Sequence, residues 1–194
     1  MQGFLLGLSS TAVCAAYCAP VFAFLVFWAP DVFAALFGER WRMSGIYAAL
    51  LAPVGLLSLF TVWPERVFAV AQRQQVSLLV QVASDSASIA LVWGLLLAGV
   101  APLFCIGAFS LAQCIYHLVC LFAIFRTARF EPAAYWHLLQ RIGKLLLLAV
   151  AAFMLVKALA PSKLTEFMIS GFLMALYYLW LWRRMRRLLP GSGH

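Results

Sequence analysis

Six long apolar runs, separated by short polar stretches, dominate the hydrophobic pattern of the chain. Each run is close to the length that crosses a hydrocarbon core of roughly 30 Å. Because backbone groups in lipid must find hydrogen-bond partners within their own segment, each run is predicted to be a helix. The pattern therefore predicts an all-α, polytopic membrane helix bundle that fills residues 1–194 as one integral membrane domain. The predicted helices cover about residues 4–28, 44–63, 77–98, 103–125, 145–160 and 167–182.

The stretches between these runs differ in character. Residues 29–37 hold apolar side chains at helical spacing and are expected to lie in the membrane surface rather than cross it. Residues 126–144 form the longest predicted loop, and its Tyr135 and Trp136 are typical of interfacial anchors. Residues 99–102 and 161–166 are short connections, which predict antiparallel neighbouring helices.

Composition leaves no room for a soluble domain, because 66% of the residues are hydrophobic and 10% are charged, against about a quarter charged in soluble domains. The net charge of +8 would suit nucleic acid, but no basic domain stands clear of the predicted helices. The charges instead divide unevenly between alternate loops, and cytoplasmic loops carry the excess of Lys and Arg. Both termini are therefore predicted to be cytoplasmic. The smaller set is Arg40, Arg42, Lys157 and Lys163, and the larger set holds the other 10 of the 14 basic residues.

Residues 28–53 carry the most distinctive order of residues. The first predicted helix ends at Trp28, and a Leu-Phe-Gly turn and a charged cluster precede a helix that contains Gly45 and Pro53. This turn contacts either anionic glycan or simply the membrane interface. Its residues are Phe37, Gly38, Glu39, Arg40, Trp41 and Arg42.

In this order of features, and in the Arg-Val-Phe and Gln-Arg-Gln sequences at 66–68 and 72–74, the chain resembles the second half of bacterial polysaccharide-biosynthesis flippases. These are O-antigen-type, lipid-linked oligosaccharide exporters of the MATE-like superfamily. The resemblance is best over residues 20–75 and extends over most of the chain. It implies the C-terminal lobe of a transporter of about fourteen helices that works by alternating access.

The resemblance also implies a bacterial cytoplasmic (inner) membrane location and undecaprenyl-linked glycan as substrate. The first eight helices are then missing from this chain, so the expected partners are the lipid bilayer and either an N-terminal lobe or a second copy of the chain. The alternative is a truncated accessory or scaffold protein that does not transport and associates with a larger partner. Nucleic acid is not an expected partner.

Polar residues at helical spacing mark a possible substrate or ion pathway on the third and fourth predicted helices. Asp85 is the one acidic residue deep inside a predicted helix, and ionisable groups in a membrane usually face a cavity or a partner. Asp85 and His117 both lie roughly 12 Å from the cytoplasmic helix ends and are predicted to pair across the hairpin. The pair serves either an ion-linked site or helix packing. The candidates are Asp85, His117, Gln81, Ser84, Ser88 and Gln113.

Other residues raise hypotheses of lesser weight. Pro20 and Pro53 lie inside predicted helices and are candidates for helix bends. The 5 cysteines form no Cys-x-x-Cys motif, so they are expected to act as small apolar residues rather than as a membrane thiol enzyme. The histidines are scattered, without the spacing of metal ligands. No metal, no cofactor and no enzymatic activity are predicted.

Overall fold

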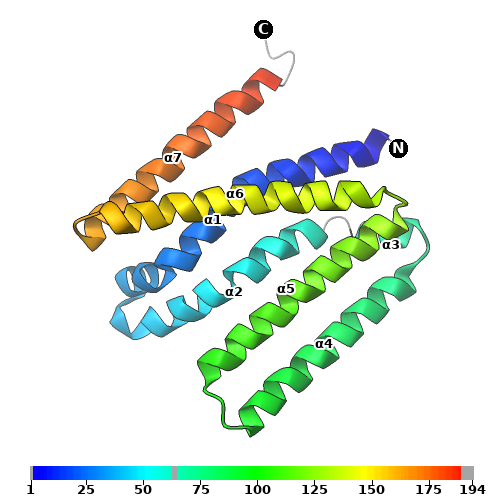
Figure 1. Ribbon diagram of the computed structural model, residues 1–194, viewed down its shortest axis with the longest axis horizontal. Coiled ribbons are helices and arrows are strands. Elements are labelled where there is room, and N and C mark those ends of the chain that lie inside the picture. Colours follow the sequence, from blue (N-terminus) through cyan, green and yellow to red (C-terminus); the bar gives the residue numbers. More distant parts are fainter. Residues whose placement is uncertain (1, 63–64, 189–194) are drawn as a thin grey trace. The chain divides into compact units, whose positions relative to one another are not determined.

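The computed structural model describes residues 2–62 and 65–188, with side chains described for 17–62, 65–131 and 133–183. Within these ranges the chain is helical and contains no strand, which confirms the all-α prediction. Figure 1 shows the succession of helices along the chain. They are α1 (Gln2–Phe37), η1 (Glu39–Trp41), α2 (Arg42–Thr61), α3 (Arg66–Val70), α4 (Gln74–Leu97), α5 (Pro102–Thr127), α6 (Pro132–Leu159) and α7 (Lys163–Leu188).

Six helical segments of the described chain are long and apolar enough to cross a membrane, as expected of a multi-pass membrane protein. They begin at Tyr17, Glu39, Gln74, Pro102, Ala133 and Lys163. The chain divides into two compact units, residues 1–146 and 147–194. The boundary falls inside α6, so the first unit contains the start of that helix and the second contains its end together with α7. The single-domain organisation stays a prediction.

The first predicted helix does not end at residue 28, because α1 continues to Phe37. Pro30 lies inside the helix, where it removes one backbone donor and bends the helix without terminating it. In Figure 1 the last turns of α1 run in a different direction from the turns before them. Residues 29–37 are therefore the end of α1 and not a separate segment. Termination falls to Gly38, whose φ of 96° and ψ of 162° lie in a region open almost only to glycine.

The predicted loop over residues 126–144 is also wrong from residue 132 onward, because α6 begins at Pro132. Proline suits the first helical position, where a backbone N–H would lack a partner in any case. Tyr135, Leu138 and Ile142 follow on one face, and all three are buried. This first part of α6 is amphipathic rather than uniformly apolar. Its polar face lowers the mean hydropathy, so no apolar run marks this part of the helix.

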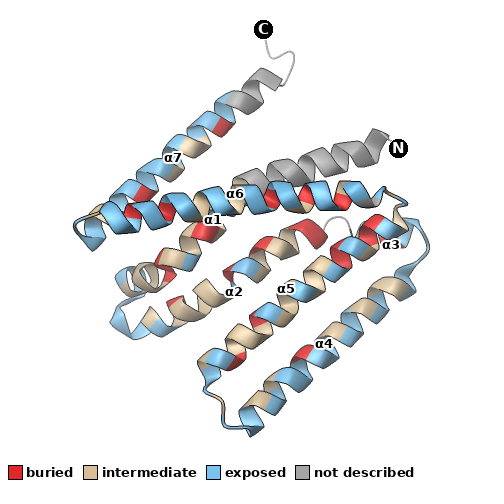
Figure 2. Ribbon diagram, viewed as in Figure 1, coloured by how far each residue is buried: buried red, intermediate tan, exposed pale blue. Residues whose placement is uncertain are grey.

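The core of the first unit is formed by α1, α2, α5 and the start of α6. Its aromatic members are Phe60 of α2, Phe125 of α5 and Tyr135 of α6. The short helix α3, which the apolar runs did not predict, adds a second small cluster in which Phe68 packs on Cys120 and Ile124 of α5. In Figure 2, α4 is coloured mostly exposed, and Ser88 is its one buried residue. The first core cluster consists of Ala19, Leu56, Phe60, Leu121, Phe125, Tyr135, Leu138 and Ile142.

Candidate functional site

The helices α4 and α5 pack against each other as an antiparallel hairpin that carries the predicted polar residues. Ser88 of α4 is 2% exposed, and its hydroxyl accepts a hydrogen bond from Nε2 of Gln113 on α5 at 3.4 Å. Polar contacts of this kind commonly hold membrane helices together. The structure therefore brings Ser88 and Gln113 into contact between the two helices.

The predicted pair of Asp85 and His117 does not form among the described hydrogen bonds and ion pairs. His117 of α5 turns toward α2, where its Nδ1 lies 2.9 Å from Oγ1 of Thr61. Asp85 and Gln81 are exposed on α4, and Ser84 is half-buried. The prediction was wrong because residue spacing fixes the depth of a side chain but not the neighbouring helix that it reaches.

Proton counting limits how Thr61 and His117 interact. The Thr61 hydroxyl has one proton, and it lies within hydrogen-bond distance of both His117 Nδ1, at 2.9 Å, and the Ser58 carbonyl, at 3.1 Å. If the hydroxyl donates to the Ser58 carbonyl, Nδ1 of His117 must carry a proton and donate to Thr61. If it donates to His117, Nδ1 must be unprotonated. The tautomer of His117 therefore depends on whether the Thr61 hydroxyl donates to His117 or to the Ser58 carbonyl near the end of α2.

A second polar residue of α5 supports the backbone of α2 beside its proline. Pro53 lies inside α2, where it has no N–H to donate and its ring crowds the preceding turn. The Leu50 carbonyl in that turn accepts a hydrogen bond from the buried Ser110 hydroxyl at 2.6 Å. Side chains of neighbouring helices commonly satisfy backbone groups near a membrane proline in this way.

The contacts near the start of α4, at the other end of the α4–α5 hairpin, were not predicted from the sequence. Glu65, just before α3, accepts a hydrogen bond from the Ser77 hydroxyl of α4 at 2.7 Å. The predicted candidate residues included neither Ser77 nor Thr61. Thr61 and Glu65 are four residues apart in the sequence. That helical spacing of polar residues could have indicated a polar contact at the end of α2.

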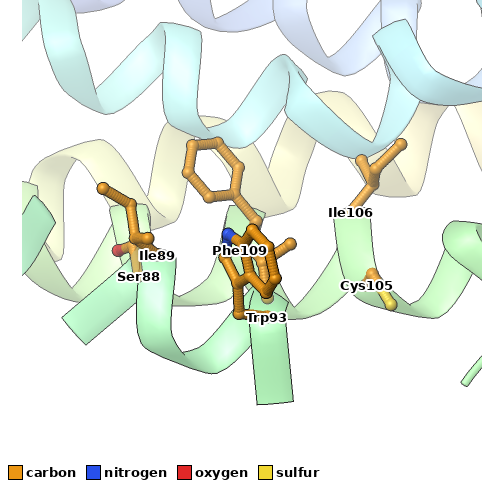
Figure 3. Close-up of a pocket in the computed structure, with 7 residues that line it drawn as sticks. Ser88, Ile89, Trp93, Cys105, Ile106 and Phe109 are labelled. Atoms are coloured by element: carbon orange, nitrogen blue, oxygen red, sulfur yellow. The ribbon is translucent and has the colours of Figure 1, made fainter. Parts of the chain in front are cut away.

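An apolar pocket of about 350 Å³ lies between the second half of α4 and the first half of α5. Figure 3 shows that Ser88, Ile89 and Trp93 of α4 line it together with Cys105, Ile106 and Phe109 of α5. Ser88 is its one hydroxyl-bearing residue, and that hydroxyl already accepts from Gln113. The pocket is suited to an apolar group and offers no charged side chain to a glycan.

The predicted interfacial turn is held by ion pairs within the chain. Arg42 donates from Nη1 to Oδ1 of Asp31 at 2.6 Å and from Nη2 to Oε2 of Glu39 at 3.1 Å, and its Nε also pairs with Glu39. The aromatic ring of Trp41 lies 5.9 Å from that of Phe37, and both side chains are exposed. The turn thus joins the end of α1 to the start of α2 and presents aromatic side chains as an interfacial anchor would. Arg40 is exposed beside it.

The predicted bend prolines differ in their surroundings. Pro20 lies half-buried in α1, whereas Pro53 is exposed on α2. Pro30 also lies inside α1 and was not among the predicted bend prolines.

No three His, Cys, Asp or Glu residues in the described part of the chain gather as metal ligands would. Cys105 and Cys120 are buried, while Cys14 falls outside the residues whose side chains are described. Cys105 lies 3.6 Å from the Val100 carbonyl, a contact that fixes the start of α5.

No protein-family model matches the chain, and neither curated proteins nor solved structures gave a match. The flippase resemblance therefore rests on the residues of the sequence and stays a prediction.

Proposed function

We propose that this chain is one lobe of a membrane transporter that moves lipid-linked oligosaccharide across the bacterial cytoplasmic membrane by alternating access. The proposal joins the sequence resemblance to one observation, the exposed polar face of α4. The six apolar helical segments support a membrane location. The substrate and the direction of transport come from the resemblance alone.

The exposed polar face of α4 is the structural observation that supports this proposal. Asp85 lies about 16 Å along α4 from its first residue, near the middle of a helix that runs from Gln74 to Leu97. A carboxylate in the centre of a bilayer is costly, and such residues face a cavity or another protein rather than lipid. Asp85 and Gln81 are both exposed. This face therefore requires a covering surface, and a second lobe with a hydrated path between the lobes would supply it.

Two features of α1 and α2 suit a lobe that changes shape. Both helices contain prolines in their interiors, where the missing backbone N–H allows a helix to bend. Their contact is close, because Gly45 lies directly against the backbone of Ala29 and Pro30. This close contact would make the two helices move together when either bends at a proline.

A reconstituted flipping assay tests the proposal. Vesicles with the chain alone are expected to leave lipid-linked oligosaccharide in its original leaflet. A fusion of the chain to an eight-helix N-terminal lobe is expected to expose the glycan on the other side. The same fusion with Asp85→Asn, which keeps the size of the side chain, is the matched control for the α4 face. Flipping by the isolated, monomeric chain would refute the need for a second lobe.

The alternative function is an accessory protein that associates with a larger membrane partner. The same exposed face of α4 favours it, since a partner would cover Gln81 and Asp85 equally well. A photo-crosslinking residue at position 81 separates the two functions. The accessory role predicts an adduct with a larger membrane protein and no flipping activity in the fusion.

A further inference from the structure

The second hollow in the first unit differs from the first in being strongly basic. It has a volume of about 460 Å³ and lies where the start of α4 meets the end of α5. Three arginines line it: Arg73 precedes α4, Arg126 lies in the last turn of α5, and Arg129 follows that helix. The lining contains no acidic residue. Among the described residues, none of these arginines takes part in an ion pair.

The lining is ordered from apolar to basic along the helices. Phe122 and Ala123 lie one turn before Arg126 and Thr127 on α5, and Val76 lies one turn after Arg73 on α4. The apolar side chains are therefore nearer the middle of the spans, and the guanidinium groups are at the ends. Phe122 is 45% exposed, so its ring offers an apolar surface on the mid-span side of the arginines.

Helix termination places one of these arginines at the pocket. The backbone N–H groups of Arg129 and Phe130 donate to the carbonyls of Arg126 and Phe125, at 3.2 and 3.0 Å, which is the Schellman pattern. Arg129 has a φ of 58°, at a position where glycine is usual. The Phe130 ring packs on Phe125, with centroids 5.6 Å apart. The turn that carries Arg129 is thus anchored in the core.

We propose that this pocket binds the phosphate of an anionic phospholipid, with Arg73, Arg126 and Arg129 around the headgroup and an acyl chain along Phe122. Arginine is suited to phosphate because its planar group donates two parallel hydrogen bonds. Thr127 adds a hydroxyl to the lining. Basic pockets between membrane helices on the cytoplasmic side bind anionic headgroups, and the distribution of Lys and Arg predicts that this end faces the cytoplasm. The proposal does not depend on the transport function.

Native mass spectrometry of the full chain in detergent measures this binding directly. Phosphatidylglycerol is expected to bind more tightly than phosphatidylcholine. The double variant Arg126→Gln/Arg129→Gln should weaken phosphatidylglycerol binding by about tenfold or more, since each basic residue near a membrane surface contributes about a factor of five or more. The control Arg141→Gln/Lys144→Gln removes the same charge from exposed positions outside the pocket and should bind like the unchanged protein.

Three results would overturn the proposal. Equal weakening in the two double variants would show a general charge effect. Equal binding of the two lipids would remove the headgroup preference. Competition by inorganic phosphate as effective as that by the lipid would assign the pocket to free phosphate.

Arg126 and Arg129 also lie near the carbonyl end of α5, where basic residues stabilise a helix. That structural role alone would lower the unfolding temperature of the pocket variant without changing lipid binding.

Discussion

Gly45 of α2 lies against the backbone of Ala29 in α1 so closely that a Cβ on Gly45 would be 2.5 Å from the Ala29 carbonyl oxygen. The same Cβ would be 2.5 Å from Cα of Pro30. Neither atom belongs to a flexible side chain that could move aside. This contact fixes the approach of the two helices at the point where α1 changes direction.

Gly45→Ala should therefore destabilise the protein by about 1–3 kcal/mol, the usual cost of overpacking a close contact. Unfolding of the purified protein in detergent provides the measurement. Gly107→Ala is the matched control, because a Cβ on Gly107 of α5 would meet nothing within 4 Å. That variant should be neutral or more stable by up to about 1 kcal/mol, from helix propensity. A Gly45→Ala protein as stable as the control would show that the helices separate at little cost.

Gly38 should be sensitive for a different reason. A Cβ there would also meet nothing within 4 Å, but the backbone angles themselves exclude other residues. Gly38→Asn should cost about 1–3 kcal/mol in unfolding free energy. Gly99 has a φ of 73° in a helix-ending turn where asparagine is tolerated. Gly99→Asn should therefore cost less, and the reverse order of the two variants would contradict the backbone argument.

A double-mutant cycle should find coupling between Thr61 and His117, whose side chains lie 2.9 Å apart. Thr61→Val and His117→Leu remove the hydrogen bond with little change of size. The expected coupling is about 0.6 kcal/mol, the average for polar contacts measured in one membrane protein. The cycle between Asp85 and His117 serves as the comparison and should be additive. Coupling confined to Asp85 and His117 would restore the pair predicted from spacing.

The polar face of α4 should be open to water or covered by protein, rather than facing lipid. Gln81→Cys, in a chain without its native cysteines, should react with a membrane-impermeant maleimide if that face lines a hydrated path. Leu79→Cys lies at nearly the same depth on a different face of α4, and Leu79 is 70% exposed. It should stay unreactive, because thiols surrounded by lipid are not ionised. Equal labelling of both positions would remove the distinction between the two faces.

The predicted orientation is open to a direct test with fused reporters. A reporter active only in the cytoplasm should be active when it follows residue 194, since the excess of Lys and Arg predicts a cytoplasmic C-terminus. The same reporter placed after Gly38 should be inactive. Activity only after Gly38 would reverse the orientation of every helix and place the basic pocket on the outer side.

Apolar patterning was sufficient to predict the six spans, because a bilayer accepts little other than a helix. It failed where a helix is amphipathic or interrupted. The start of α6 alternates buried Tyr135, Leu138 and Ile142 with exposed residues such as Trp136 and Arg141, so its mean hydropathy falls although the helix continues. The end predicted at Trp28 was wrong in the opposite way, because α1 continues through Pro30 to Phe37.

The candidate site was less predictable than the fold. The contact between Ser88 and Gln113 joins two helices that the short loop at residues 98–101 makes neighbours. The partner of His117 was predicted wrongly because His117 contacts Thr61 of α2, and the position of α2 relative to α5 depends on packing in the core rather than on any local pattern. The basic pocket was predictable in principle. Arg73 at the start of one helix must approach Arg126 at the end of its antiparallel neighbour, but the sequence analysis used both only as indicators of orientation.

The hydrogen bond from Ser110 to the Leu50 carbonyl has a mechanical consequence for any motion of this unit. It ties α5 to α2 within one turn of Pro53, where the helix lacks one backbone hydrogen bond. A straightening or sharpening of α2 at that proline must either break a 2.6 Å contact in a dry environment or pull α5 along with it. Because α5 also carries Gln113 and His117, the flexing of one helix becomes a displacement of the polar contacts on another.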